Sequence, residues 1–180
     1  MRMFALLAVA LLVSSACGTP ASDGRVEATY DGTTGKLSQL TIDGSRDGKP
    51  NITSYMNGTK FVRIEIDSNE DGRVDRWEYY GDDQKVARVG FSRADDGKPD
   101  VWASRAADGS LSKLEISTRH DGAINRSEFY EAGRLARAEE DTDADGRVDK
   151  WEVYASGELV SVSFDTLKAG KPTTTVDYRK

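Results

Sequence analysis

The chain has 180 residues, a formal net charge of −6 and one cysteine, Cys17. This length fits a single domain, and the acidic balance argues against a nucleic-acid-binding protein or one drawn electrostatically to anionic lipid. With one cysteine, no disulfide can form within the chain, so an exported domain of this sequence would depend on its packing or on metal.

The N-terminus has the pattern of a secretory signal peptide over residues 1–16. Arg2 is followed by an apolar run over residues 4–13 and by small residues before Cys17, and the run is too short for a membrane span. This segment resembles the signal peptides of bacterial lipoproteins, in which the cysteine is lipidated and becomes the new N-terminus. Gly18 is similar to the sorting pattern for the outer membrane.

The resemblance implies an exported protein of the bacterial cell envelope, an outer-membrane lipoprotein held by a lipid such as palmitate on Cys17. The alternative is ordinary secretion with a free Cys17. Residues 17–29 are expected to be the lipidated cysteine and a flexible tether, because residues 18–25 are small and polar. The remaining residues, 30–180, are expected to form the folded domain.

The folded part repeats. Asp-Gly pairs end at Gly48, Gly72, Gly97, Gly122 and Gly146, and the steps between these glycines are 24, 25, 25 and 24 residues. A sixth glycine, Gly170, follows 24 residues later, and a second set of Gly-containing turn signals alternates with the first. A fixed period of this length indicates a repeat architecture, here of six hairpins.

The segments between turns alternate with the period of a half-buried strand. Val62, Ile64 and Ile66 are predicted to share one face, and Arg63 and Glu65 the other. The sequence therefore predicts an all-β fold: a meander of about twelve short antiparallel strands, as an open, curved single sheet. A closed, barrel-like sheet is the alternative. Aromatic residues in the strands are expected to serve cross-strand packing.

Two acidic turns, 67–78 and 141–152, satisfy the twelve-residue calcium-loop pattern D-x-[DN]-x-[DN]-G-x5-E. Alternate oxygen-bearing side chains of a tight loop can converge on one Ca²⁺, the glycine permits the turn, and a carbonyl at position 7 can add a ligand. We therefore expect the protein to bind about two Ca²⁺ ions. The expected ligands in the first loop are Asp67, Asn69, Asp71, the carbonyl of Arg73, Asp75 and Glu78. Those in the second loop are Asp141, Asp143, Asp145, the carbonyl of Arg147, Asp149 and Glu152. The alternative is a solvated acidic hairpin turn.

These loops look like those of EF-hands and dockerins, but their flanks read as strands. On a strand Glu152 lies about 10 Å from Asp149, so a bend or a bridging water is needed for this glutamate, and for Glu78, to reach the ion. The repeats over residues 30–178 resemble the MORN-like hairpins of the bacterial antitoxin-type family, in the marks Trp77…Tyr80 and Trp151…Tyr154…Gly157…Leu159. This resemblance implies a scaffold for assembly and binding.

The sequence carries no recognisable catalytic constellation. The one histidine, His120, lies in a turn beside Asp121, where we expect it to be solvated, and one histidine cannot give the spacing of a metal hydrolase. The glycines are single turn residues rather than a phosphate loop. We therefore expect no enzyme but an exported, lipid-anchored, calcium-binding β-repeat protein with a structural or interaction role. The alternative is a metal-independent hairpin scaffold that binds a protein or glycan partner at the cell envelope.

Overall fold

The computed structural model describes residues 25–178, which form one antiparallel sheet of 13 strands in sequence order. The predicted all-β meander and its open form are thereby confirmed. The strands are β1 (Val26–Tyr30), β2 (Leu37–Ile42), β3 (Ile52–Asn57), β4 (Lys60–Ile66), β5 (Arg76–Tyr80), β6 (Val86–Phe91), β7 (Val101–Arg105), β8 (Leu111–Ile116), β9 (Arg126–Glu131), β10 (Arg134–Glu140), β11 (Lys150–Ala155), β12 (Glu158–Phe164) and β13 (Thr174–Asp177).

The first strand begins at Val26, so residues 26–29, which the sequence placed in the tether, belong to the sheet. The predicted signal peptide and Cys17 lie outside the described residues. Over residues 25–178 the structure contains no helix long and apolar enough to cross a bilayer.

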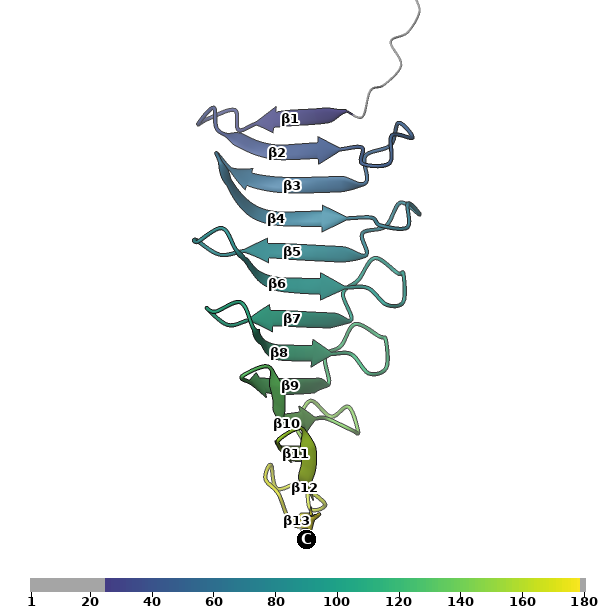
Figure 1. Ribbon diagram of the computed structural model, residues 1–180. Helices are drawn as coiled ribbons and strands as arrows, with labels where there is room; N and C mark the ends of the chain where they lie inside the picture. The colour runs from purple at the N-terminus through teal and green to yellow at the C-terminus, as the bar shows by residue number, and fades with distance from the viewer. Residues whose placement is uncertain (1–24, 179–180) are drawn as a thin grey trace, which may run out of the picture.

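Six long loops connect the strands at one side of the sheet, where the strand ends meet, and short turns connect them at the opposite strand ends (Figure 1). The sheet twists, so that β1–β8 are seen face-on while β10–β13 are turned away from the viewer (Figure 1). It does not close on itself, because β1 and β13 each pair with a single neighbour. The closed arrangement considered from the sequence is not adopted.

Each short hairpin contains a β-bulge, in which the second strand has one extra residue. In the pair of β3 and β4 this residue is Val62, because Tyr55 pairs with Arg63 while Met56 pairs with Phe61. Val62, which the sequence predicts to share a face with Ile64, is 49% exposed. The other register shifts fall at Thr29/Tyr30, Tyr79/Tyr80, Ser104/Arg105, Leu135/Arg137 and Val153/Tyr154.

One face of the sheet carries a row of aliphatic side chains that repeats with the sequence period, and we call it the aliphatic face. Its row contains one residue from each even-numbered strand up to β12: Leu40, Ile64, Val89, Leu114, Ala138 and Val162. Among the described residues, the buried apolar side chains are Trp77, Val89, Ala138 and Val162. A single layer has no second sheet or helix to cover it, so apolar burial is limited to contacts between neighbouring strands.

The opposite face, which we call the cation–aromatic face, alternates Arg or Lys with aromatic rings on adjacent strands. Arg63 lies 4.1 Å from the ring centre of Tyr55, and Arg88 lies 4.1 Å from that of Trp102. Lys113 and Arg137 flank Phe129 in the same way. Such pairs bury long alkyl stems and ring faces against each other, so they stabilise a sheet that has no covering layer.

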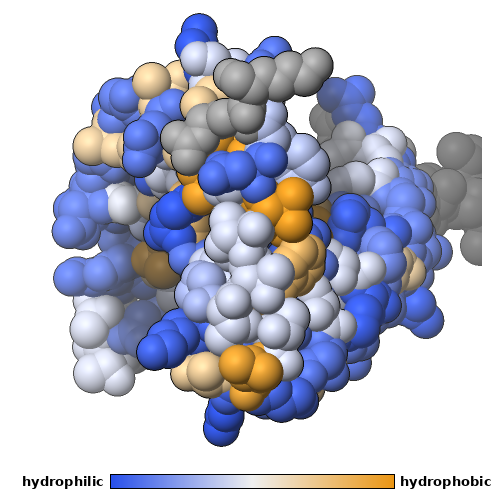
Figure 2. Space-filling model, turned by 90° about the horizontal axis from the view of Figure 1, so that it is seen from below, coloured by the Kyte–Doolittle hydropathy of each residue, from blue (hydrophilic) through white to orange (hydrophobic). Residues whose placement is uncertain are grey.

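The side chain of Trp102 lies across Gly90 on β6. A Cβ atom built on Gly90 would approach the indole ring to 2.7 Å, so only glycine leaves room for it. From the C-terminal end the surface is mostly hydrophilic, with small separate apolar patches (Figure 2).

Candidate metal centre

The six long loops share one backbone, which we number in windows of twelve residues: 43–54, 67–78, 92–103, 117–128, 141–152 and 165–176. The glycine at position 6 has a positive φ in every window, as at Gly72 (88°) and Gly146 (86°). Position 4 also has a positive φ although none of its residues is glycine: Arg46, Glu70, Asp95, His120, Ala144 and Lys168. The glycine-centred turn predicted from the sequence is thus common to all six loops, whether or not the acidic residues are complete.

Most acidic side chains of these loops hold the backbone of the turn. At position 9, an Asp, Asn or Thr side chain accepts a hydrogen bond from the N–H of position 2, as Asp75 does from Ser68 at 2.8 Å and Asp149 from Thr142 at 3.1 Å. The same bond joins Gly44 to Asn51, Arg93 to Asp100, Thr118 to Asn125 and Thr166 to Thr173. The backbone of these loops is therefore held by hydrogen bonds within the chain.

Positions 1 and 5 act similarly. Gly72 donates to Asp67 at 2.8 Å and Gly146 to Asp141 at 2.9 Å, which joins position 6 to position 1. The N–H groups of Arg73 and Arg147, the residues predicted to ligate through their carbonyls, donate to the position 5 aspartates Asp71 and Asp145 at 2.8 and 3.0 Å. Position 3 distinguishes the two calcium-type loops, because it is Asn69 and Asp143 there but Ser45, Ala94, Arg119 and Leu167 elsewhere.

Loop 141–152 brings three of its predicted ligands together. Asp141, Asp143 and Asp149 each offer a carboxylate oxygen, and these atoms lie within 4.8 Å of one another. The cluster is partly exposed, and Lys168 lies beside it with its Nζ 2.8 Å from Oδ2 of Asp143. That contact is the main reason the pKa of Asp143 is lowered. Three converging oxygen donors with an open approach are suited to a hard divalent cation.

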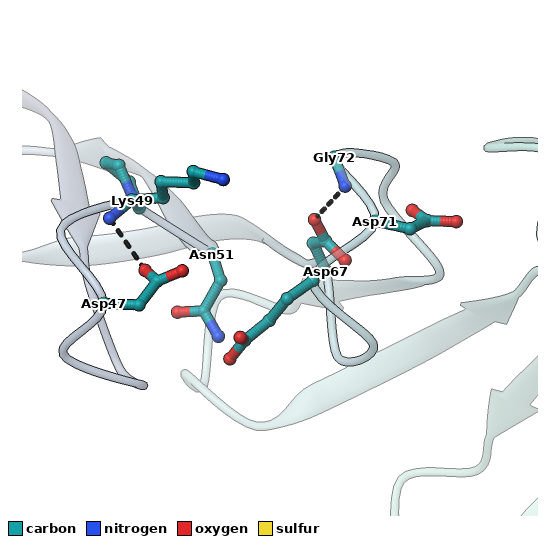
Figure 3. Close-up of a pocket in the computed structure, with 8 residues that line it drawn as sticks. Asp47, Lys49, Asn51, Asp67, Asp71 and Gly72 are labelled. Atoms are coloured by element: carbon teal, nitrogen blue, oxygen red, sulfur yellow. Dashed lines mark hydrogen bonds between the residues drawn. The ribbon is translucent and has the colours of Figure 1, made fainter.

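Two of the predicted ligands of loop 67–78, Asp67 and Asp71, line a pocket together with residues of the loop before it. The pocket has a volume of about 250 Å³ and is lined by Asp47, Lys49, Pro50, Asn51, Asp67, Glu70, Asp71 and Gly72 (Figure 3). One oxygen of Asp67 accepts the bond from Gly72, while its Oδ1 is buried without a hydrogen-bond partner. A buried carboxylate oxygen without a donor fits the role of a cation ligand.

The structure places Glu78 and Glu152 on the aliphatic face of the sheet, outside the carboxylate cluster. Glu152 accepts hydrogen bonds from Arg126 at 2.7 Å and Tyr154 at 2.9 Å, and its other oxygen pairs with Lys150 at 2.7 Å. Burial alone would raise its pKa, but the bonds from Arg126, Lys150 and Tyr154 lower the pKa to about 2.

The same arrangement occurs three times. A cation two residues before the glutamate and a tyrosine two residues after it bind the carboxylate in Arg76-Trp-Glu78-Tyr-Tyr80, Arg126-Ser-Glu128-Phe-Tyr130 and Lys150-Trp-Glu152-Val-Tyr154. Residues two apart on a strand share a face. Sequence reasoning missed this Arg/Lys-x-Glu-x-Tyr signal, which also appears after loop 117–128, where Arg119 occupies position 3.

Loop 92–103 shows how an acidic loop is neutralised by the protein itself. Asp100 is 2% exposed, and its carboxylate binds Arg93 of the same loop at 3.3 Å and Nδ1 of His120 from the next loop at 2.8 Å. Burial raises the pKa of Asp100, but the bonds from Arg93 and His120 outweigh it, so the pKa is lowered. His120 is therefore a partner of a buried carboxylate.

No family profile and no curated protein matches the chain. Among solved structures, part of the fold is similar to TarM, with a TM-score of 0.41 and 20% identity over 53% of this chain and 18% of that chain. A variant of S. aureus TarM in complex with fondaparinux, alpha-GlcNAc-glycerol and UDP has the same TM-score at 18% identity and the same coverage. Accessory secretory protein 1, 2 and 3 of Streptococcus pneumoniae gives a TM-score of 0.31 at 14% identity, over 58% of this chain and 17% of that one. With scores below 0.5, nothing about function follows from these similarities.

Proposed function

We propose that the protein is an exported, lipid-anchored β-repeat protein that binds Ca²⁺ at loops 67–78 and 141–152, with a structural or interaction role at the cell envelope and no catalytic one. The observation that carries this proposal is the convergence of Asp141, Asp143 and Asp149, whose oxygens lie within 4.8 Å. All the donors are oxygens on one turn, a set that favours Ca²⁺ over Zn²⁺, which prefers nitrogen and sulfur ligands.

Calcium would act by removing repulsion between like charges. Loop 141–152 gathers four aspartates, and their mutual repulsion is relieved when a divalent cation is coordinated between them. Because the turn hydrogen bonds already form the loop, the ion would rigidify an existing turn rather than fold the chain. Extracellular modules of this kind bind calcium at roughly 10⁻⁴–10⁻³ M, so the sites would fill in calcium-rich surroundings.

The test is a calorimetric titration of the purified protein with calcium. We expect about two sites in the wild type and the loss of one in Asp143→Ser, a change that copies Ser45 of loop 43–54 and so suits the shared backbone. The control Asp82→Ser lies on a short turn at the opposite ends of the strands, removes the same charge and should leave both sites intact. Absence of binding heat at millimolar calcium would refute the proposal.

A second candidate is a metal-independent hairpin scaffold for a protein or glycan partner. It is supported by the turn hydrogen bonds and by the binding of Asp100 to Arg93 and His120, since these contacts use only the protein's own groups. A thermal melt that is identical in calcium and in chelator, with partner capture unchanged, would select this candidate. The lipid anchor has its own test, since Cys17→Ser should release the protein from the membrane fraction.

A further inference from the structure

Lys168 reaches from the loop between β12 and β13 back to loop 141–152. Its Nζ lies 2.8 Å from Oδ2 of Asp143 and 3.6 Å from Oδ2 of Asp145. The two loops are held in this relation by the backbone, because the N–H of Asp165 donates to the carbonyl of Asp149 at 2.8 Å. The ammonium group thus binds the position 3 and position 5 carboxylates of the loop before it.

We infer that Lys168 is the internal counter-ion of loop 141–152 and competes with calcium for Asp143 and Asp145. The competition rests on the proposed calcium site, whereas the counter-ion contact is a property of the structure itself. A divalent cation bound between Asp141, Asp143 and Asp149 would lie close to the ammonium group that contacts Asp143, and the two cations would repel each other. Binding of the metal therefore weakens the contact between Lys168 and Asp143.

A contact from position 4 back to the preceding loop also occurs elsewhere in the sheet, although to a different position of that loop. Lys168 occupies position 4 of its loop, the position with a positive φ of 55°. The equivalent residue of loop 117–128 is His120, which reaches back to the buried Asp100 of its preceding loop at 2.8 Å. In these two loops a side chain at position 4 reaches back to a carboxylate of the loop before it.

The two proposed calcium loops differ in the side chain that position 4 of the next loop supplies. For loop 67–78 the position 4 residue of the next loop is Asp95, which supplies no cation. Loop 141–152 instead receives Lys168, so calcium binding there carries the additional cost of breaking an ion pair. Since coupling is reciprocal, calcium at Asp143 should also release Lys168 and loosen the loop that leads to the edge strand β13.

The test compares Lys168→Met with Lys171→Met in a calcium titration by calorimetry at low ionic strength. Both changes remove one positive charge from the same loop, but only Lys168 contacts the aspartates of loop 141–152. An exposed ion pair of this kind corresponds to an affinity change of about two- to five-fold. We expect Lys168→Met to tighten one of the two sites by that factor, with the gain abolished by Asp143→Ser and reduced at high salt.

The outcomes separate this inference from the proposed function. If the wild type binds calcium and Lys168→Met has the same affinities as Lys171→Met, the competition is refuted while the calcium site stands. If only Lys168→Met binds calcium, the inference is supported in its strongest form. If the wild type and both variants bind none, the calcium site and the competition both fail. Amide exchange in chelator then tests the counter-ion contact alone, since Lys168→Met should speed exchange in loop 141–152 and Lys171→Met should not.

Discussion

Replacing Glu152 by Gln distinguishes a residue that stabilises the sheet from one that binds metal. The sequence pattern predicts a calcium ligand at this position, whereas the structure pairs the carboxylate with Arg126, Lys150 and Tyr154. Gln has the size of Glu but no charge, so it keeps the packing and removes the ion pairs. If the pairing determines the role of Glu152, the cost appears in stability and is the same with and without calcium.

The magnitude follows from the pKa of Glu152, which is lowered from 4.5 to about 2 in a residue that is 8% exposed. Each pKa unit corresponds to about 1.4 kcal/mol, so ionisation of Glu152 stabilises the fold by about 3 kcal/mol at neutral pH. Because the folded pKa is the lower one, this contribution is fully present above pH 4.5. It is lost as the pH falls from 4.5 through about 2.

The assay is urea unfolding of the wild type, Glu152→Gln and the charge-matched control Glu158→Gln, in calcium and in chelator. We expect Glu152→Gln to lose about 3 kcal/mol at pH 7 in both solutions, and the difference from the wild type to vanish near pH 2. Glu158 lies exposed on the neighbouring strand, so its variant should match the wild type. A loss below 1 kcal/mol in chelator, together with loss of one calcium site, would refute the pairing and support the ligand role.

Two further substitutions test the packing of the single layer and the internal neutralisation of a loop. Gly90→Ala should lower the free energy of unfolding by about 1–3 kcal/mol, because its Cβ would overlap the ring of Trp102. The control Gly32→Ala has open space around the new Cβ and should change the stability little. Equal melting temperatures for the two variants would contradict this prediction. Arg93→Met should lower the free energy of unfolding in denaturant by about 1–3 kcal/mol, because it removes a partner of the buried carboxylate of Asp100. Adding Asp100→Asn should recover part of this loss. If nothing is recovered, the loss does not arise from the charge of Asp100.

The fold could be predicted because its signals are local and repeated. The period of the Asp-Gly pairs and the alternation within each strand are enough to specify turns, strands and an antiparallel meander, and β1–β13 follow them. The position of the bulges could not be predicted, because an extra residue such as Val62 continues the alternation in the sequence while the register shifts in space. The first strand was missed at Val26 because small and polar neighbours obscure a short edge strand.

The candidate site was predictable only as far as the turn. The loop pattern correctly brings Asp141, Asp143 and Asp149 together. It does not reveal that Glu152 pairs with Arg126, which lies 26 residues earlier, or that Lys168 arrives from the next repeat. Both contacts join neighbouring repeats across the sheet, and a pattern confined to twelve residues carries no information about them.

The number of strands has a consequence for how copies of the chain can associate. With 13 strands joined only by antiparallel pairings, the two outermost strands, β1 and β13, run in the same direction. A second copy added end to end by simple translation would therefore meet the first strand to strand in parallel, unlike every junction inside the molecule. Within the described residues both edge strands could pair with a further strand, and the odd count means that an antiparallel junction requires two copies related by a two-fold axis, with β1 against β1 or β13 against β13.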